Sequence, residues 1–499
     1  MTLLLVLPIV LPLVTAALAL AAWRSVRVQR VVTLVGGVGL LVAAVLLLRA
    51  VDAAGVLATQ AGGWPAPFGI TLVADLFSAL MVTLAAGVGC AVAVFSVMST
   101  AEDEERLGYY PLFNILMMGI CGAFLTGDIF DLYVWFEVML MSSFVMLAMG
   151  GSRDQTEGAF KYVVVNLVSS TLFLTALGLI YPLTGTLNMA DLAGVMETLP
   201  PARMTVLAML FLVAFGIKAA LFPLYGWLPA SYHTPPAATA AIFAALLTKV
   251  GVYALVRVFT LLFVHDVGFT HTILLWLSGC TMVAGVLGAL VQRDMRRVFS
   301  FLLISHIGYI TMGLGLFTPL ALTGAIVYTA HHIVVKAVLF LSAGVVARVA
   351  GTYDLDRLGG LYLRQPSLAV LFLIGGLALS GIPPLSGFFP KVALMQAALE
   401  TSRYTLVGIA ILAGVLTLYA VMRVWAEVFW KAAPTPPREP MRVGAMLAPV
   451  WALALCTIGM GVLAEPLVDL GHRAATQLLE RSAYVEAVLG SRPAAGPHP

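Results

Sequence analysis

Four lysines stand inside long apolar stretches of this sequence, where charged residues are otherwise rare. Lys218, Lys249, Lys336 and Lys391 each lie well within such a stretch, and Glu137 lies in another. If these stretches cross a bilayer, each charge at a helix centre costs about 2.5 to 3.5 kcal/mol, so four lysines cost roughly 10 to 14 kcal/mol without partners or water. A cost of that size indicates a function for these residues.

The chemistry that buried lysines and carboxylates support is proton transfer. Burial disfavours the charged form of a lysine, whereas a nearby carboxylate favours it, so a lysine with a movable acidic partner is a protonation switch. Glu137 and Lys218 are the candidates for such a pair. A static ion pair that holds two helices together is the alternative.

Histidines accompany the lysines and provide candidates for a relay between them. His306 and His332 are the stronger candidates, and His332 shares a helix face with Lys336, four residues later. For any single histidine, a satisfied hydrogen bond within the bundle is the alternative. The predicted proton-transfer residues are Glu137, Lys218, Lys249, His306, His332, Lys336 and Lys391.

A repeated pattern predicts two interrupted helices. The motif Pro-Leu-x-Gly-aromatic-x-Pro occurs at 223–229 and again at 384–390. Proline removes a backbone donor and clashes with the preceding turn, and unpaired backbone at membrane depth is tolerated where it lines a cavity. Paired interruptions in two halves are typical of inverted-repeat transporters, and two merely kinked helices are the alternative. The residues concerned are Pro223, Gly226, Pro229, Pro384, Gly387 and Pro390.

The elements that position these residues are predicted to be transmembrane helices. Of the 499 residues, 61% are hydrophobic and 10% charged, whereas soluble domains carry about 25% charged residues. Because about 20 apolar residues cross a bilayer, we predict an all-α polytopic membrane protein with about fourteen spans. The spans are 2–22, 31–48, 71–99, 109–127, 129–149, 159–181, 203–231, 237–262, 271–291, 298–316, 321–347, 366–400, 404–430 and 444–468.

The repeat predicts how the chain is divided. A weaker match sets Asn166 beside His332 and Ser170 beside Lys336. Five helices would fall in each half, and an odd number forces the halves into opposite membrane orientations. The predicted parts are 1–108 with three helices, 109–262 as the first repeat, 271–430 as the second repeat, and 431–499 with the last helix and a short tail.

The basic residues predict the orientation of the chain. With the N-terminus outside, fifteen Lys and Arg residues fall in inside loops and their flanks, and only Arg49, Arg203 and Arg403 fall in outside loops. Both termini are therefore predicted to lie outside. Arg257 and Arg423 remain within spans, about two turns from helix ends, and we expect them to snorkel to the interface.

Several functions are excluded by what the sequence lacks. A net charge of +3 without a run of Lys or Arg argues against nucleic-acid binding. No nucleophile elbow, phosphate-binding loop or dinucleotide fingerprint occurs in its expected context, so we expect no enzyme activity and no cofactor. The four cysteines lie far apart without metal-ligand spacing, and we expect free, buried thiols and no metal site.

Four stretches of the sequence carry a family resemblance. They are 131–137, 161–170, 215–229 and 386–391. With these stretches the chain resembles the antiporter-like subunits shared by Mrp-type Na⁺/H⁺ antiporters, respiratory complex I and membrane-bound hydrogenases, and within that family the D-type subunit of Mrp antiporters. The similarity covers nearly the whole chain. A lysine at 391, where some complex I subunits of this type have glutamate, narrows the choice between Mrp and complex I subunits without deciding it.

The resemblance implies a function and a setting. It implies a proton-conducting subunit of a multisubunit Na⁺/H⁺ antiporter in a bacterial inner membrane, assembled with other membrane subunits. Glu137 and Lys218 would form the coupled pair beside one half-channel, Lys249 and the histidines the central relay with water, and Lys391 the end of the second half-channel. A proton-pumping subunit of a complex I or hydrogenase-type respiratory complex is the alternative, and a scaffold whose lysines are dispensable for transport is another.

Overall fold

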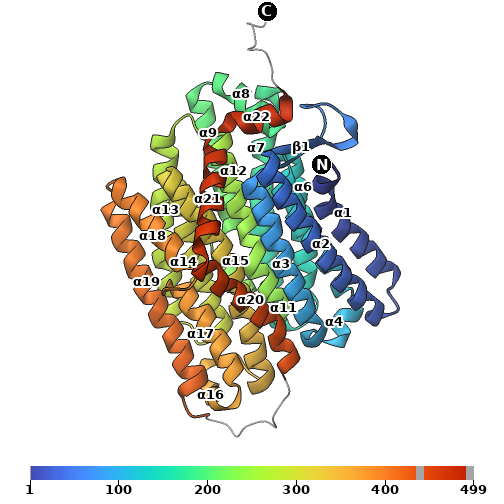
Figure 1. Ribbon diagram of the computed structural model, residues 1–499, viewed down its shortest axis with the longest axis vertical. Helices are drawn as coiled ribbons and strands as arrows, with labels where there is room; N and C mark the ends of the chain where they lie inside the picture. Colours follow the sequence, from blue (N-terminus) through green and yellow to red (C-terminus); the bar gives the residue numbers. More distant parts are fainter. Residues whose placement is uncertain (1, 434–442, 491–499) are drawn as a thin grey trace, which may run out of the picture.

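The computed structural model describes residues 2–433 and 443–490, and these form a bundle of long helices (Figure 1). The N-terminal elements are α1 (Thr2–Ala21), α2 (Val26–Ala54), β1 (Leu57–Gln60), η1 (Ala61–Gly63), β2 (Thr71–Ala74), α3 (Leu76–Ser99) and α4 (Glu102–Arg106). Then follow α5 (Tyr109–Leu125), α6 (Ile129–Ala148), α7 (Arg153–Thr184), α8 (Met189–Val195), η2 (Met196–Thr198), α9 (Pro201–Ala219), α10 (Trp227–Ser231), α11 (Ala237–Ile242), η3 (Phe243–Leu247) and α12 (Thr248–Leu261).

The second half of the described chain is likewise helical. It contains α13 (Val267–Leu290), α14 (Met295–Leu316), α15 (Pro319–Ala350), η4 (Leu355–Arg357), α16 (Leu361–Arg364), α17 (Pro366–Ser380), α18 (Phe388–Glu400), α19 (Tyr404–Trp425), η5 (Ala426–Trp430), α20 (Gly444–Val462), α21 (Ala464–Leu479) and α22 (Arg481–Leu489). The elements η3 and η5 are π-helical turns that continue their neighbouring α-helices.

The described helices reproduce the predicted membrane spans. Twelve helical stretches are long and apolar enough to cross a membrane, and two shorter apolar helices, α5 and α17, supply the remaining two of the fourteen predicted segments. The chain is therefore an all-α polytopic membrane protein, as its composition predicts.

Polar residues at the helix ends explain where several spans begin and end. The Asp75 carboxylate accepts a hydrogen bond from the Ser78 amide, and the Ser78 hydroxyl accepts one from the Asp75 amide. These two bonds form a capping box that starts α3. Thr318 caps α15, with Pro319 in the first helical position, where its missing N–H costs nothing. Gly351 ends α15 with φ 78°, a left-handed conformation that favours glycine.

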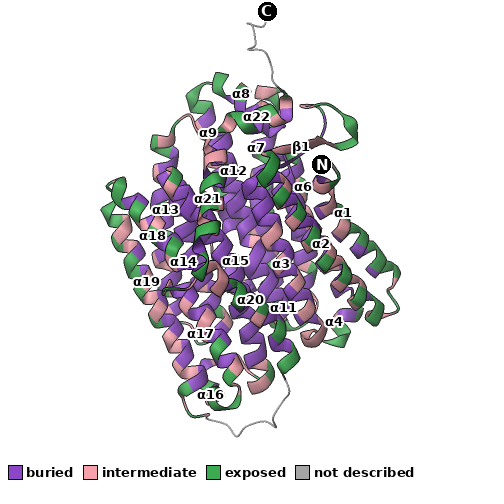
Figure 2. Ribbon diagram, viewed as in Figure 1, coloured by how far each residue is buried: buried purple, intermediate pink, exposed green. Residues whose placement is uncertain are grey.

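Helix α15 forms the centre of the bundle. Every residue from Ala321 to Val346 is buried, and α15 packs against α14, α17, α18, α20, α21, α11 and α3. Figure 2 shows the buried residues concentrated along α12, α14 and α15, with exposed residues on the outer helices. A helix that is buried on all sides presents no face to lipid, so its polar residues lie inside the protein.

The same backbone pairing occurs twice, 166 residues apart. The bonds join Met189 N to Gly127 O (2.8 Å) and Ile129 N to Leu187 O (2.9 Å), and later Leu355 N to Arg293 O (2.8 Å) and Met295 N to Tyr353 O (3.0 Å). The first pairing leads into α8 at the top of Figure 1, and the second precedes α16 at the bottom. This arrangement agrees with two halves of opposite orientation; the domain boundaries themselves stay a prediction.

The span predicted at 71–99 begins as a strand instead of a helix. Residues Thr71–Ala74 pair antiparallel with Leu57–Gln60, with Leu57 opposite Ala74 and Gln60 opposite Thr71. A short apolar run does not distinguish a strand from the first turn of a helix. The helix itself starts at Leu76, after the Asp75 cap.

The segment predicted as the end of the last span and a short tail is largely helical. Helix α20 ends at Val462, α21 packs against α15 and α3, and α22 packs against α8. Helix α21 is amphipathic, with apolar residues on one side and charged residues on the other. Its mean hydropathy is therefore low, and a search for apolar runs does not detect it. The last predicted span is therefore shorter, and the described part of the tail, up to residue 490, belongs to the packed structure.

Two of the four cysteines contradict the prediction of buried thiols. Cys121 is buried and Cys90 is partly buried, but Cys280 and Cys456 are exposed on the outside of the chain. An outer face of a membrane protein is as apolar as its core, so hydropathy does not tell which side of a helix faces inward.

Candidate functional site

The first helix interruption places Lys218 beside an unwound segment. Helix α9 ends at Ala219, Ala220 adopts a left-handed conformation with φ 60°, and α10 resumes at Trp227. The amide of Leu221 donates to Gly216 O at 2.9 Å, which closes the helix end. Pro223 and Gly226 lie within the interruption, and Pro229 lies in α10.

The second interruption has the same form and precedes Lys391. Helix α17 ends at Ser380, Gly381 has φ 84°, and α18 resumes at Phe388. A Cβ at Gly387 would lie 2.1 Å from the carbonyl oxygen of Ala378, so only glycine fits there. At Gly226 a Cβ would meet nothing within 4 Å, so packing gives no reason for that glycine. Pro384 lies in the interruption with Gly387, and Pro390 lies in α18.

Lys218 and Glu137 lie near each other but do not form an ion pair. Lys218 is 8% exposed, and its Nζ lies 5.3 Å from the ring centre of Phe136, the neighbour of Glu137 on α6. Its hydrogen-bond partner is Ser170 Oγ on α7, at 3.4 Å. Oε1 of Glu137 is buried without a partner among the described residues. The static ion pair is therefore absent from this conformation.

A small cavity lies beside Lys218. Its volume is about 20 Å³, and its lining includes Lys218, Asn166, Tyr232 and Leu247. That volume is enough for one water molecule, provided that polar partners are present. Lys218 and Asn166 supply them, and the hydroxyl of Tyr232 is buried without another partner among the described residues. Leu247 belongs to the π-helical turn η3, immediately before α12.

Lys249 is bonded to the π-helical turn. Its Nζ donates to Ala244 O at 2.5 Å, and Lys249 is fully buried. Because a π turn shifts the backbone bonding by one residue, it leaves a carbonyl free for a side chain, and such turns are frequent at functional sites. The hydroxyl of Thr248 lies beside it without a partner among the described residues.

Aromatic and imidazole rings continue from the centre of the bundle toward Lys391. The rings of His306 and His332 stack with centres 5.5 Å apart, and Nδ1 of His306 hydrogen-bonds the Tyr328 hydroxyl. Tyr328 stacks on Tyr309 at 5.4 Å, and Lys391 Nζ lies 5.0 Å from the centre of the Tyr309 ring. Both ring nitrogens of His332 and Nε2 of His306 are buried without partners among the described residues. Buried polar atoms of this kind normally bind water.

His331 and Lys336 also lie on α15, and each bonds to a neighbouring segment. His331 Nδ1 hydrogen-bonds Ser386 Oγ in the second interruption at 2.7 Å, so α15 holds the interruption in place. Lys336 is fully buried and donates to Phe299 O at 3.1 Å.

Lys391 is bound by the end of α17 rather than facing lipid. It is 6% exposed and donates to Ser380 O at 2.8 Å and to Leu379 O at 3.3 Å. These carbonyls belong to the last turn of a helix, which lacks intrahelical donors and carries partial negative charge. A cleft of about 250 Å³, lined by residues of α18 and α19, reaches Lys391 and Tyr309.

The expectation that Arg257 snorkels to the interface is wrong. Arg257 is 4% exposed, and its Nη1 lies 2.6 Å from Oδ2 of Asp75, while Nη2 donates to Tyr253 Oη at 3.0 Å. Sequence reasoning missed Asp75 as its partner, although a carboxylate inside the predicted span 71–99 was a signal. Arg423 is partly buried and donates to Gln292 O at 2.9 Å and to Leu290 O, where it caps the end of α13.

A second buried carboxylate that sequence reasoning missed lies near the opposite end of the bundle. Glu105 is 0% exposed and accepts hydrogen bonds from Arg30 at 2.6 and 2.9 Å and from Tyr110 at 2.7 Å. This pair ties α2 to α4 and α5, outside the row of lysines and histidines. It is a structural contact of the N-terminal helices.

Comparison with known proteins places the chain in a family. A family model described as NADH:quinone oxidoreductase/Mrp antiporter, transmembrane region, matches residues 126–417. The chain belongs to this family. The matched part of this antiporter-family chain includes both helix interruptions and every predicted proton-transfer residue, and it leaves α1 to α5 and α20 to α22 outside.

Individual relatives resemble the chain over nearly its whole length. The D-type subunit of the Na⁺/H⁺ antiporter of Alkalihalophilus pseudofirmus is 45% identical over 488 residues, which cover 97% of this chain and 99% of that protein. A chain in the structure of the Mrp complex from Dietzia sp. is 32% identical with a TM-score of 0.92, covering 98% of this chain and 100% of that one. A chain of respiratory complex I from Thermus thermophilus is 25% identical with a TM-score of 0.83, covering 96% and 99%.

Proposed function

We propose that this chain is the proton-conducting D-type subunit of an Mrp-type Na⁺/H⁺ antiporter, a secondary transporter component rather than an enzyme. The observation that carries the proposal is the row of buried lysines and histidines that joins two helix interruptions. The 45% identity to a protein named as the D-type subunit of a Na⁺/H⁺ antiporter supports it. Other membrane subunits of the complex are its partners, and a bacterial inner membrane, with both chain termini outside, is its setting.

In the proposed path, protons pass from one interruption to the other through the bundle. Glu137 and Lys218 gate one end, because the protonation of a buried lysine depends on how near a carboxylate lies. The cavity of about 20 Å³ beside Lys218 is also lined by Leu247, which belongs to the turn that binds Lys249. From there His332, His306 and the two tyrosines, with water at their unpaired atoms, lead to Lys391. Lys336 extends the set of buried bases along α15.

The opposite orientation of the two halves gives this path a direction. If the half-channels open to opposite sides of the membrane, the transmembrane voltage contributes about 2.3 kcal/mol per charge per 100 mV. That energy is enough to bias which lysines hold a proton. The separation of Lys218 from Glu137 in this structure is one state of the proposed switch, and a closed ion pair is the other.

The test is the transport activity of variants at the pair. In everted vesicles that contain the intact complex, Glu137→Ala and Lys218→Ala should each lower Na⁺-dependent antiport by about tenfold or more, because removing a proton-transfer group typically costs at least that much. Lys161→Ala is the matched control, since Lys161 pairs with Glu157 at the exposed end of α7. Unchanged antiport in both pair variants, with normal assembly, would refute the proposed path.

The respiratory alternative is distinguished by the partners of the chain. A complex I or hydrogenase-type subunit would use the same row of residues, and the complex I chain is less similar than the Mrp chain. Purification from native membranes should therefore recover small membrane subunits without any dehydrogenase component. Recovery of a dehydrogenase component would favour the alternative.

A further inference from the structure

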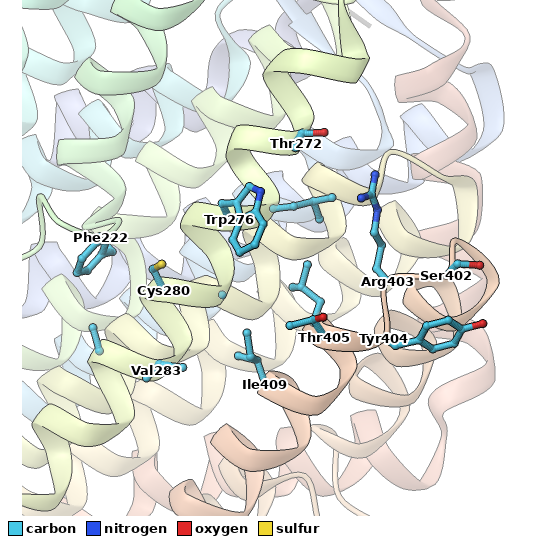
Figure 3. A pocket seen from close by; sticks show the side chains of 14 residues that line it. Phe222, Thr272, Trp276, Cys280, Val283, Ser402, Arg403, Tyr404, Thr405 and Ile409 are labelled. Atoms are coloured by element: carbon cyan, nitrogen blue, oxygen red, sulfur yellow. The ribbon is translucent and has the colours of Figure 1, made fainter.

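A groove on the outer surface lies away from the proposed proton path. It has a volume of about 540 Å³ and runs between α13 and α19, near the turn that joins α18 to α19. Figure 3 shows Thr272, Ser402 and Arg403 at one end, and Phe222, Val283 and other apolar side chains toward the other end. The groove is therefore amphipathic along its length.

The polar end carries a cation without a partner. Arg403 is exposed at the start of α19, and its guanidinium makes no ion pair or side-chain hydrogen bond within the described residues. The nearest acidic residue in the sequence, Glu400, instead accepts a hydrogen bond from Gln396 at 2.9 Å. The Arg403 amide donates to Ala398 O at 2.8 Å, and this bond fixes the turn. Its position between two transmembrane helices places Arg403 at a membrane boundary.

The size of the groove distinguishes between possible occupants. Three turns of a helix about 10 Å across occupy on the order of 1,000 Å³, so a helix of a partner subunit would lie across this open groove without filling it. Its volume of about 540 Å³ lies in the range of small-molecule sites. The apolar lining, with Trp276 69% exposed, suits a hydrocarbon chain.

We propose that this groove binds one anionic phospholipid. The phosphate group contacts Arg403 and the neighbouring hydroxyls of Ser402 and Thr405, and one acyl chain lies along α13 past Trp276 toward Phe222. A guanidinium with free N–H donors suits a phosphate oxygen, and the groove continues inward from it. The shared chemistry of the occupant is thus a net negative head group on an apolar tail.

The far end of the groove connects the lipid to the first helix interruption. Phe222 lies within that interruption, and its amide donates to Thr281 Oγ1 on α13 at 3.0 Å. An acyl chain that reaches Phe222 therefore lies against the unwound segment that follows Lys218. The bound lipid supports the position of this segment from outside the bundle.

The experiment measures how brominated lipids quench Trp276. The purified complex is reconstituted in vesicles of phosphatidylcholine that contain increasing amounts of brominated phosphatidylglycerol or brominated phosphatidylcholine. The Trp276 signal is the difference between the wild-type protein and Trp276→Phe. Half-maximal quenching should need about fivefold less phosphatidylglycerol than phosphatidylcholine, as expected for one basic side chain near an anionic surface.

Two variants and one control make the result specific. Arg403→Gln should raise the phosphatidylglycerol concentration needed for half-maximal quenching to the value for phosphatidylcholine. The control is Arg203→Gln, which replaces another exposed arginine at an outside helix start and should leave the preference for phosphatidylglycerol unchanged. Gly279→Leu fills the apolar part, where a Cβ meets only Ile409 at 3.4 Å, and should weaken quenching by both lipids. Equal quenching by the two lipids in the wild type would overturn the proposal. Absence of quenching by either lipid would also overturn it and would indicate a partner subunit over the groove.

Discussion

The buried ion pair between Asp75 and Arg257 gives the sharpest energetic prediction. It joins the start of α3 to α12, with 2.6 Å between Nη1 of Arg257 and Oδ2 of Asp75. The side chains of Arg257 and Asp75 are only 5% and 3% exposed. Asp75→Asn keeps the oxygen that caps α3 but leaves the guanidinium without its counter-charge. Leaving one charge of a buried pair uncompensated typically costs about 3 to 5 kcal/mol. We expect a cost in that range for Asp75→Asn.

Replacing Asp75 and replacing Arg257 should not cost the same amount of folding free energy. After Arg257→Gln, the Asp75 carboxylate keeps the hydrogen bond from the Ser78 amide at 2.8 Å. After Asp75→Asn, the guanidinium keeps the Tyr253 hydroxyl as its side-chain acceptor within the described part of the chain. Arg257→Gln should therefore cost less than Asp75→Asn. The double variant removes both charges and should cost at least about 2 kcal/mol less than the sum of the single variants.

The assay uses the reactivity of a buried thiol. Cys121 is 0% exposed on α5, which packs against α3 and α12, so its alkylation requires opening of this region. With Cys90, Cys280 and Cys456 replaced by serine, a loss of about 3 to 5 kcal/mol should accelerate Cys121 alkylation by roughly a hundredfold or more, because about 1.4 kcal/mol is a factor of ten.

The control replaces an ion pair that is open to solvent. Nη1 of Arg293 and Oδ2 of Asp356 lie 2.6 Å apart, but these side chains are 75% and 56% exposed. Asp356→Asn should therefore leave the rate of Cys121 alkylation nearly unchanged. Single variants at Asp75 and Arg257 that behave like this control, or a double variant that costs the full sum, would refute the reasoning.

Two further predictions concern Lys391 and His233. Lys391→Met should lower antiport by about tenfold or more, because the base at the end of the path is lost, while the complex still assembles. The control is Lys431→Met, at a half-buried pair with Glu427, which should leave antiport unchanged. Equal loss in both variants would point to a general effect of charge. At the end of α10, burial and then the Arg297 guanidinium, which donates to Nε2 at 3.0 Å, lower the pKa of His233 to about 4. The unfolded chain, with a histidine pKa near 6.5, then binds more protons than the folded one between about pH 6.5 and 4, so the thermal midpoint should fall with pH through that window. His233→Gln should reduce this fall, and an identical fall in the variant would contradict the assignment.

The sequence predicts the frame of this protein well because the bilayer imposes simple rules. Apolar length marks each span, and proline and glycine mark the two interruptions, since both act on the backbone locally. The buried lysines are visible because a charge within an apolar stretch needs a reason. Each of these signals, taken singly, is contained within about twenty consecutive residues of the chain.

What the sequence does not reveal is which side chains meet across the bundle. Asp75 and Arg257 are 182 residues apart in the chain, and nothing near Arg257 indicates that its partner starts α3. The same holds for Lys249, whose acceptor exists only because η3 is π-helical. Helix α21 escapes detection because half of its surface is polar, yet it packs against the central helix.

The position of α15 has a consequence for the order in which the protein is made. Helix α15 leaves the ribosome before α17, α18, α20 and α21, which all pack against it in the finished molecule. A Cβ at Gly471 on α21 would lie 2.7 Å from Val327 on α15, so this contact is tight once formed. Until α21 is synthesised, one side of α15 lacks its final cover, although the helix already carries two histidines and a lysine. These polar side chains must therefore be sheltered by water, lipid head groups or the insertion machinery while synthesis continues.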